Sequence, residues 1–191
     1  MVIGIFGKSG SGKSTVCEYL KNKGFYVIDA DKLGHKILKK GEEGYKKVLE
    51  AFGDSFLDED GEIDRKKLGK YVFENKKAHI LSSISHPIID SLVEEEINKS
   101  KKSHNNTVID AALLCNTRIK DMCDKLILIK SDNLVERIKI RDNITDEMAN
   151  NRLLSQDIKE IADIVIENNG AIDELFLKTD EVLRKEIPHY E

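Results

Sequence analysis

The chain has 191 residues, 40% of them hydrophobic, which is enough for one well-packed core and a smaller lobe. Its formal net charge is −4 and its acidic side chains are scattered, so the composition does not indicate a nucleic-acid partner. No apolar run approaches the roughly 20 residues that a membrane-spanning helix needs. The three cysteines form no Cys-x-x-Cys pair, which favours reduced thiols. We therefore expect a cytoplasmic protein without a membrane or nucleic-acid partner.

A glycine-rich motif follows the first apolar run, Val2–Phe6. Residues 7–14 read Gly-Lys-Ser-Gly-Ser-Gly-Lys-Ser, the G-x-x-x-x-G-K-S pattern, and a helical segment begins at its end. Glycines let the backbone wrap a triphosphate and point N–H groups at it, so strand, loop and helix together predict a P-loop that binds ATP. Lys13 is expected at the β- and γ-phosphates and Ser14 at Mg²⁺. The other nucleotide ligands predicted from the motif are Gly10, Ser11, Gly12 and Thr15.

Further apolar runs are continuous rather than alternating, which is typical of parallel strands buried on both faces. The five predicted strands are Val2–Phe6, Tyr26–Asp29, Thr107–Ala111, Leu126–Ile129 and Asp163–Ile166. The helices predicted around them are Lys13–Lys23, Asn133–Arg141, Asp146–Gln156 and Ile172–Lys185. The pattern predicts an α/β protein with a five-stranded parallel sheet flanked by helices.

The stretch between the second and third strands is far longer than the dozen or so residues that a simple crossover requires. It contains no strong strand signal, and we predict helices near Lys32–Lys40, Glu42–Phe52, Asp64–Glu74 and Pro87–Lys99, with His86-Pro87 as a break. The expected domains are therefore a nucleotide-binding core of residues 1–31 and 107–191, and an inserted helical substrate-binding lobe of residues 32–106.

Carboxylates follow the second and third strands. Val27-Ile28-Asp29-Ala30-Asp31 brings acids to the carboxyl edge of the sheet, where open α/β folds bind ligands. Alternation along an extended chain puts Asp29 and Asp31 on one side, and Asp31 is expected to face the γ-phosphate. There it can orient a hydroxyl, accept its proton or hold Mg²⁺ through water, although either acid can instead cap the next helix. Asp110 ends a Walker B-like run and is an expected indirect Mg²⁺ ligand.

Three of the six arginines, Arg137, Arg141 and Arg152, lie close together in the sequence. Arg137 and Arg141 are four residues apart and share a helix face. The planar guanidinium suits a transferring phosphoryl group, so we expect a small lid near residues 137–158 with Arg137 and Arg141 on ATP. The alternative is a solvated helix face on which Glu136 and Asp142 are the ion-pair partners.

The sequence resembles the dephospho-coenzyme A kinases, a family with the P-loop kinase fold, from Val2 to about Leu175. The motifs that carry the resemblance are Gly10-Ser11-Gly12-Lys13-Ser14-Thr15, Val27-Ile28-Asp29-Ala30-Asp31, Phe52-Gly53, Asp60-Gly61, Asp64-Arg65, Val72-Phe73, His86-Pro87, Arg141-Asp142, Ala162-Asp163 and Val165-Ile166-Glu167-Asn168-Asn169-Gly170. The resemblance implies ATP-dependent phosphorylation of the ribose 3′-hydroxyl of dephospho-coenzyme A. It implies that Asp31 is the catalytic base, assisted by Lys13 and Arg141, and that the inserted lobe binds coenzyme A. The expected substrate-binding residues are Asp29, Asp31, His35, Arg65, His86 and Asn116.

Two segments depart from that family's usual pattern. Residues 112–116 read Ala-Leu-Leu-Cys-Asn, where the family usually has Pro-Leu-Leu-aromatic-Glu, so Asn116 supplies no charge. The segment between Gln156 and Ala162 is about four residues shorter than is usual, and only Lys159 is a loose counterpart of a basic residue common there. Neither change touches the P-loop or Asp31, so we expect activity to be retained.

Two other functions fit the P-loop. A nucleoside or nucleotide kinase of the same fold has the same loop, core and lid, but its acceptor pocket does not require the His-Pro and Asp-Gly…Asp-Arg pattern. A guanine-specific switch protein normally shows Asn-Lys-x-Asp, and none of the Asn-Lys pairs here is followed by an Asp two residues later.

Overall fold

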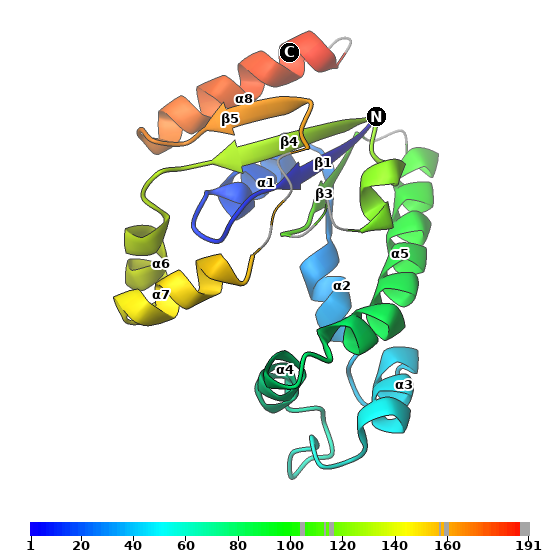
Figure 1. Cartoon of the computed structure of the whole chain (residues 1–191). Helices are drawn as coiled ribbons and strands as arrows, with labels where there is room; N and C mark the ends of the chain where they lie inside the picture. The colour runs from blue at the N-terminus through cyan, green and yellow to red at the C-terminus, as the bar shows by residue number, and fades with distance from the viewer. Residues whose placement is uncertain (104–105, 113, 115–116, 157, 159–160, 188–191) are drawn as a thin grey trace. The chain divides into compact units, whose positions relative to one another are not determined.

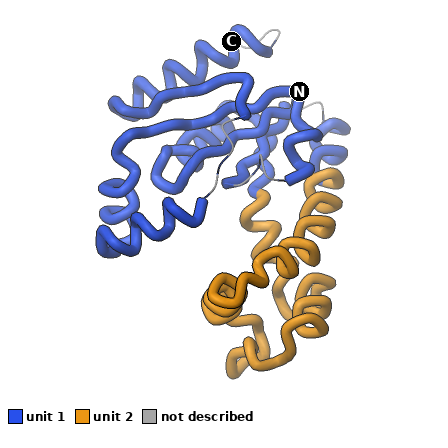
Figure 2. The backbone as a smooth tube through the Cα atoms, in the orientation of Figure 1, with its two compact units in different colours: residues 1–29, 96–191 blue, residues 30–95 orange. Residues whose placement is uncertain are grey.

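The computed structural model describes residues 1–103, 106–112, 114, 117–156, 158 and 161–187. Its backbone divides into two compact units, coloured separately in Figure 2. We call residues 1–29 and 96–191 the core unit, and residues 30–95 the helical unit.

A parallel sheet organises the core unit. Its strands are β1 (Val2–Phe6), β2 (Tyr26–Asp29), β3 (Thr107–Asp110), β4 (Lys125–Lys130) and β5 (Ile164–Glu167). Their order is β2-β3-β1-β4-β5, and every neighbouring pair runs parallel (Figure 1). Two inner strands of the sheet, β1 and β3, are buried along their whole length, as continuous apolar runs predict. The predicted five-stranded parallel sheet is confirmed.

Helices cover the sheet because each has one apolar face. On α1 (Lys13–Asn22) Val16 and Leu20 are buried, and on α8 (Ile172–Glu186) Leu175 and Leu183 are buried, all in one cluster with sheet residues such as Ile5. Figure 1 shows α8 running along β5. The other face of β1 packs against the segment that follows the short 3-10 helix η2 (Arg118–Met122). There Gly4 lies so close to Cys123 that an added Cβ would be 2.9 Å from the Cys123 Sγ.

The helices α6 (Leu134–Asp142) and α7 (Asp146–Leu154) pack against each other where the lid is predicted. The Thr145 hydroxyl caps α7 by accepting a hydrogen bond from the Met148 N–H.

The helical unit contains α2 (Ala30–Lys36), α3 (Glu43–Phe52), α4 (Arg65–Glu74) and most of α5 (Ala78–Lys102). It has a hydrophobic cluster of its own, formed by Val48, Phe56, Ile63, Leu68 and Val72. The Asp64 carboxylate caps α4 by accepting from the N–H groups of Lys66 and Lys67, each at 3.0 Å. A separate core explains why this stretch folds as a compact lobe rather than as a crossover.

Two helices differ from the sequence predictions by more than two residues at one or both ends. The expected break at His86-Pro87 is wrong, because α5 continues through Pro87. Proline leaves the carbonyl four residues earlier without its helical partner, and that residue, Ser83, is exposed so that water can replace the partner. The helix predicted for residues 32–40 instead begins at Ala30 and ends at Lys36. Among the described residues, no helix combines the length and apolarity that crossing a bilayer requires.

Candidate active site

The P-loop joins β1 to α1 and its glycines are required there. Gly10 and Gly12 have φ values of 81° and 98°, in the left-handed region that side chains disfavour. Space is also short, since a Cβ on Gly10 would lie 3.1 Å from the Leu134 carbonyl oxygen on α6. A Cβ on Gly12 would overlap the side-chain amide nitrogen of Asn168. The loop is therefore held between α6 and the end of β5.

Lys13, the first residue of α1, forms an ion pair with Asp110 at the end of β3. Only 12% and 10% of the two side chains are exposed. Asp29 lies beside Asp110 in the β2–β3 register, so the second carboxylate also ends at this edge of the sheet. Of the other motif residues, Ser14 is exposed and Thr15 half-buried in the first turn of α1. The structure thus places Lys13, Asp110 and Asp29 near the carboxyl edge of the sheet.

On α1, Cys17 is a buried thiol. Burial is the main factor that raises its pKa above the ordinary cysteine value, and the nearby Asp110 carboxylate adds to the rise, while the Lys13 ammonium partly opposes it. The thiol therefore stays protonated and packs as an apolar group. Cys17 and Cys123 are both free thiols.

Two residues without a role predicted from the sequence contact the loop. The Gln156 side chain accepts a hydrogen bond from the Ser9 N–H at 2.8 Å and donates one to the Ser9 hydroxyl at 3.0 Å. The buried Asn168 amide donates to the Ser11 carbonyl oxygen at 2.7 Å. Asn168 directly follows β5, and its place at a carboxyl strand end was the signal available in the sequence. No such signal marks Gln156.

A cavity of about 330 Å³ lies beside the P-loop. Its lining includes Lys8, Ser11, Ser131, Leu134 and Ile158. Within the described part of the chain, the buried hydroxyls of Ser11 and Ser131 have no hydrogen-bond partner. Buried polar groups are normally satisfied, so these hydroxyls are available to water or to a ligand.

The arginines of α6 have different partners. The Arg137 guanidinium donates to the Asn168 carbonyl oxygen at 3.0 Å, whereas Arg141 makes two hydrogen bonds to Asp142, at 2.8 and 2.9 Å. Arg152 of α7 also pairs with Asp142, and Glu136 pairs with Lys139. The Arg141 hydrogen bond is the largest cause that lowers the pKa of the Asp142 carboxyl to about 2.

The sequence model of the dephospho-CoA kinase family matches residues 1–174. The chain belongs to this family. A curated dephospho-CoA kinase of Fusobacterium nucleatum is 38% identical over 94% of this chain and 95% of that protein. One from Staphylococcus aureus is 37% identical over 97% of this chain and 93% of its own length. The solved dephospho-CoA kinase of Campylobacter jejuni superposes with a TM-score of 0.70 at 30% identity, covering 97% of this chain and 96% of that one.

The residues predicted for the acceptor substrate of this dephospho-CoA kinase family member lie mostly in the helical unit. Asp31 is exposed in the first turn of α2, and His35 is exposed near its end. Arg65 is the first residue of α4, and His86 is half-buried within α5. Asn116 lies outside the described residues.

The alternation predicted for Asp29 and Asp31 is wrong. Strand β2 ends at Asp29 and α2 begins at Ala30, so strand alternation does not extend to Asp31 and does not put both acids on one side. Asp31 follows Asp29 by two residues of chain, and its role in the reaction stays a prediction, as do the roles of the lid arginines.

Proposed function

We propose that this enzyme transfers the γ-phosphoryl group of ATP to the ribose 3′-hydroxyl of dephospho-coenzyme A, giving coenzyme A and ADP. This is the last step of coenzyme A biosynthesis. The observation that carries the proposal is the formed P-loop in a chain that matches the dephospho-CoA kinase family from residue 1 to 174. The cytoplasmic location and the lack of a nucleic-acid partner remain predictions of the composition.

Lys13 is the proposed cation for the donor phosphates. Its ammonium lies against Asp110, at a site with little exposure to water. A triphosphate brings several negative charges to the first turn of α1, where the helix dipole also favours an anion. We propose that Lys13 then contacts the β- and γ-phosphates and neutralises the negative charge that the transition state spreads over the transferring group.

Mg²⁺ fits this site when the phosphates supply the other ligands. Among the described residues, no group of three or more His, Cys, Asp or Glu side chains is arranged to hold a metal ion by itself. Mg²⁺ in kinases is held by one or two protein oxygens together with phosphates and water, so a complete protein cage is not required. Ser14 would hold it directly and Asp110 through water, and the ion would neutralise phosphate charge.

For the acceptor, we propose Asp31 as the group that orients the 3′-hydroxyl and takes its proton. Its carboxylate lies at the start of α2, directly after the strand whose carboxyl end carries Asp29. Asp29, His35, Arg65, His86 and Asn116 are proposed to bind dephospho-coenzyme A. Arg141, with Arg137 in support, is proposed to stabilise the transferring phosphoryl group from the lid.

The direct test is an assay with purified protein, ATP, Mg²⁺ and dephospho-coenzyme A, with the product identified by mass. We expect one phosphate to be added at the ribose 3′ position. A panel of nucleosides and nucleoside monophosphates tests the alternative kinase function. Faster turnover of a panel member than of dephospho-coenzyme A would overturn the proposal.

Asp31→Asn tests the acceptor site. The amide keeps size and hydrogen bonding but removes the charge and the proton acceptor, so kcat is expected to fall about 100-fold or more with little change in KM. Asp54→Asn is the matched control, because Asp54 is an exposed acid of the same unit, and its kcat should stay at the wild-type value. A collapse of dephospho-coenzyme A binding with normal turnover of bound substrate would make Asp31 a binding residue instead.

A further inference from the structure

Asn168 joins three parts of the core unit at the carboxyl edge of the sheet. It directly follows β5, is 7% exposed, and donates its backbone N–H to the Lys130 carbonyl oxygen at the end of β4 at 2.7 Å. Its own carbonyl oxygen accepts from the Arg137 guanidinium of α6 at 3.0 Å. Its side-chain amide donates to the Ser11 carbonyl oxygen of the P-loop at 2.7 Å. The Asn168 side chain has no role in the reaction proposed above.

The last of these hydrogen bonds fixes the direction of a P-loop peptide. A trans peptide is planar, and its C=O and N–H point in opposite directions. Because the Ser11 carbonyl points at Asn168, the N–H of Gly12 points away from Asn168. The contact is close, since any Cβ on Gly12 would overlap the Asn168 amide nitrogen. The Asn168 amide on one side of the P-loop thus orients the Gly12 N–H toward the opposite side.

We propose that Asn168 is a positioning residue for ATP: its amide holds the Ser11–Gly12 peptide so that the Gly12 N–H faces the bound phosphates. Arg137 acts in the same arrangement, because it anchors α6 to the backbone of Asn168, and α6 in turn packs on Gly10. The position of the P-loop is therefore coupled to α6, the first helix of the predicted lid. This inference rests on the proposed function for its nucleotide, but not for the acceptor.

The chemistry of the amide makes the proposal specific. An amide is a neutral donor, which the Ser11 carbonyl oxygen needs. A carboxylate of the same shape only accepts, so it would face that oxygen unfavourably and add negative charge beside the phosphates. Alanine or serine at this position removes the donor or draws it out of reach.

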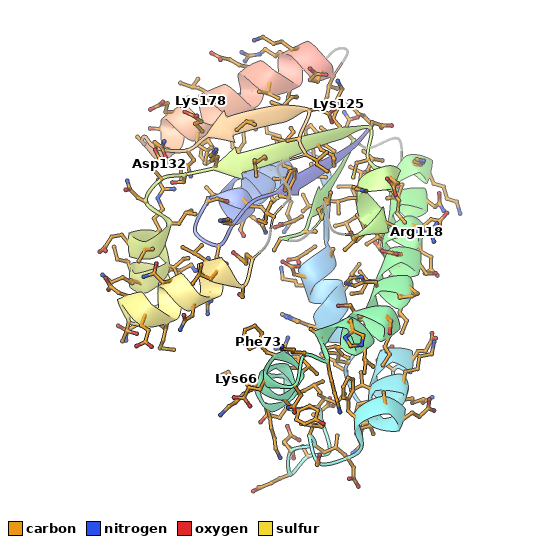
Figure 3. The ribbon with its side chains drawn as sticks, viewed as in Figure 1. Lys66, Phe73, Arg118, Lys125, Asp132 and Lys178 are labelled. Atoms are coloured by element: carbon orange, nitrogen blue, oxygen red, sulfur yellow. The ribbon has the colours of Figure 1, made fainter. Side chains whose placement is uncertain are left out.

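The neighbouring Asn169 provides a matched control. It is exposed, and its amide donates to the Asp132 carboxylate at 2.7 Å while its side-chain oxygen accepts from the Asp132 N–H at 3.0 Å. Figure 3 labels Asp132, which lies between the end of β4 and α6. Asn169 therefore also links the ends of β4 and β5, but among the described residues no hydrogen bond of its side chain reaches the P-loop.

The experiment measures the Kd of ATP by calorimetry in the absence of acceptor, together with steady-state kinetics and thermal unfolding. We expect Asn168→Ala and Asn168→Ser to weaken ATP binding about tenfold, as the loss of one buried hydrogen bond implies. Asn168→Asp should weaken it about 100-fold. The KM of the acceptor should change less than about twofold in all three variants. Asn169→Ala should leave the Kd of ATP within about twofold of wild type.

Two results would overturn the proposal. One is an equal loss of ATP affinity in Asn168→Ala and Asn169→Ala, which would mean that the strand ends matter only for stability. The other is a lower melting temperature in Asn168→Ser with an unchanged Kd of ATP. Because the binding experiment contains no acceptor, a failure of the proposed function would appear separately, as tight ATP binding without phosphorylation of dephospho-coenzyme A.

Discussion

Two ion pairs of the core unit differ in the sequence separation of their partners and in their exposure to water. Lys13 and Asp110 are 97 residues apart in sequence, and 12% and 10% of their side chains are exposed. Arg141 and Asp142 are neighbours on α6, and 55% and 24% of their side chains are exposed. Charge interactions are stronger where water is excluded, and exposed pairs contribute little to stability.

This difference agrees with the parts that the two cations are proposed to play. The Lys13 ammonium is held by tertiary structure, at a fixed place where phosphates are expected to arrive. Arg141 is held by its neighbour on a solvated helix, so its guanidinium can exchange partners at low cost. A P-loop needs the first kind of cation, which is preorganised, and a closing lid needs the second.

The largest expected effect follows from removing the buried cation. Lys13→Ala should lower kcat about 100- to 1000-fold, because it removes the ammonium that neutralises part of the charge spread over the phosphoryl oxygens in the transition state. Steady-state kinetics with dephospho-coenzyme A measures it, and circular dichroism checks the fold. Near wild-type turnover in a folded variant would refute the P-loop assignment.

A double variant separates the electrostatic role of Lys13 from its structural one. Lys13→Ala leaves the buried Asp110 carboxylate without that ammonium, so the free energy of unfolding should fall by about 1–3 kcal/mol. Adding Asp110→Asn removes the charge and should restore most of this loss without restoring turnover. Denaturant unfolding measures the difference. Restored turnover in the double variant would show that Lys13 acts only by compensating Asp110.

A smaller effect is expected at the exposed cation. Arg141→Lys keeps the charge but loses the two-pronged guanidinium, so kcat should fall about tenfold while the Kd of ATP changes little. Arg184→Lys is the control, because Arg184 is exposed on α8, and its kinetics should match wild type. Equal effects at the two positions would mean that the α6 arginine is only a surface feature.

The sheet and the P-loop could be predicted because their signals are local. Runs such as Val2–Phe6 are apolar throughout, and the glycine spacing of the loop is set by backbone geometry. The continuity of α5 through Pro87 could not be predicted, because it depends on whether the carbonyl of Ser83 reaches solvent. Local rules treat every interior proline alike.

The contacts that hold the loop could not be predicted for a related reason. Asn168 lies 157 residues from Ser11, and Gln156 lies 147 residues from Ser9. Only the folded sheet brings the end of β5 to the loop. The strand alternation argued for Asp31 also failed, since the chain turns into α2 at Ala30.

The smallest expected effect is the pH dependence of the exposed pair. Hydrogen bonds from Arg141 and then Arg152 lower the pKa of Asp142 to about 2, below the value of about 4 expected in the unfolded chain. A lowered pKa in the folded state stabilises the protein above pH 4, and the gain disappears as the pH falls from about 4 to about 2. Carboxyl NMR should show Asp142 titrating near pH 2, and Arg152→Ala should raise that midpoint.

Asp142→Asn should lower the melting temperature slightly at pH 7, and the difference should shrink at high salt, because exposed charges are screened. A large difference in melting temperature that persists at high salt would show that the Arg141–Asp142 pair behaves like the buried Lys13–Asp110 pair. The proposed contrast between the two cations would then be wrong.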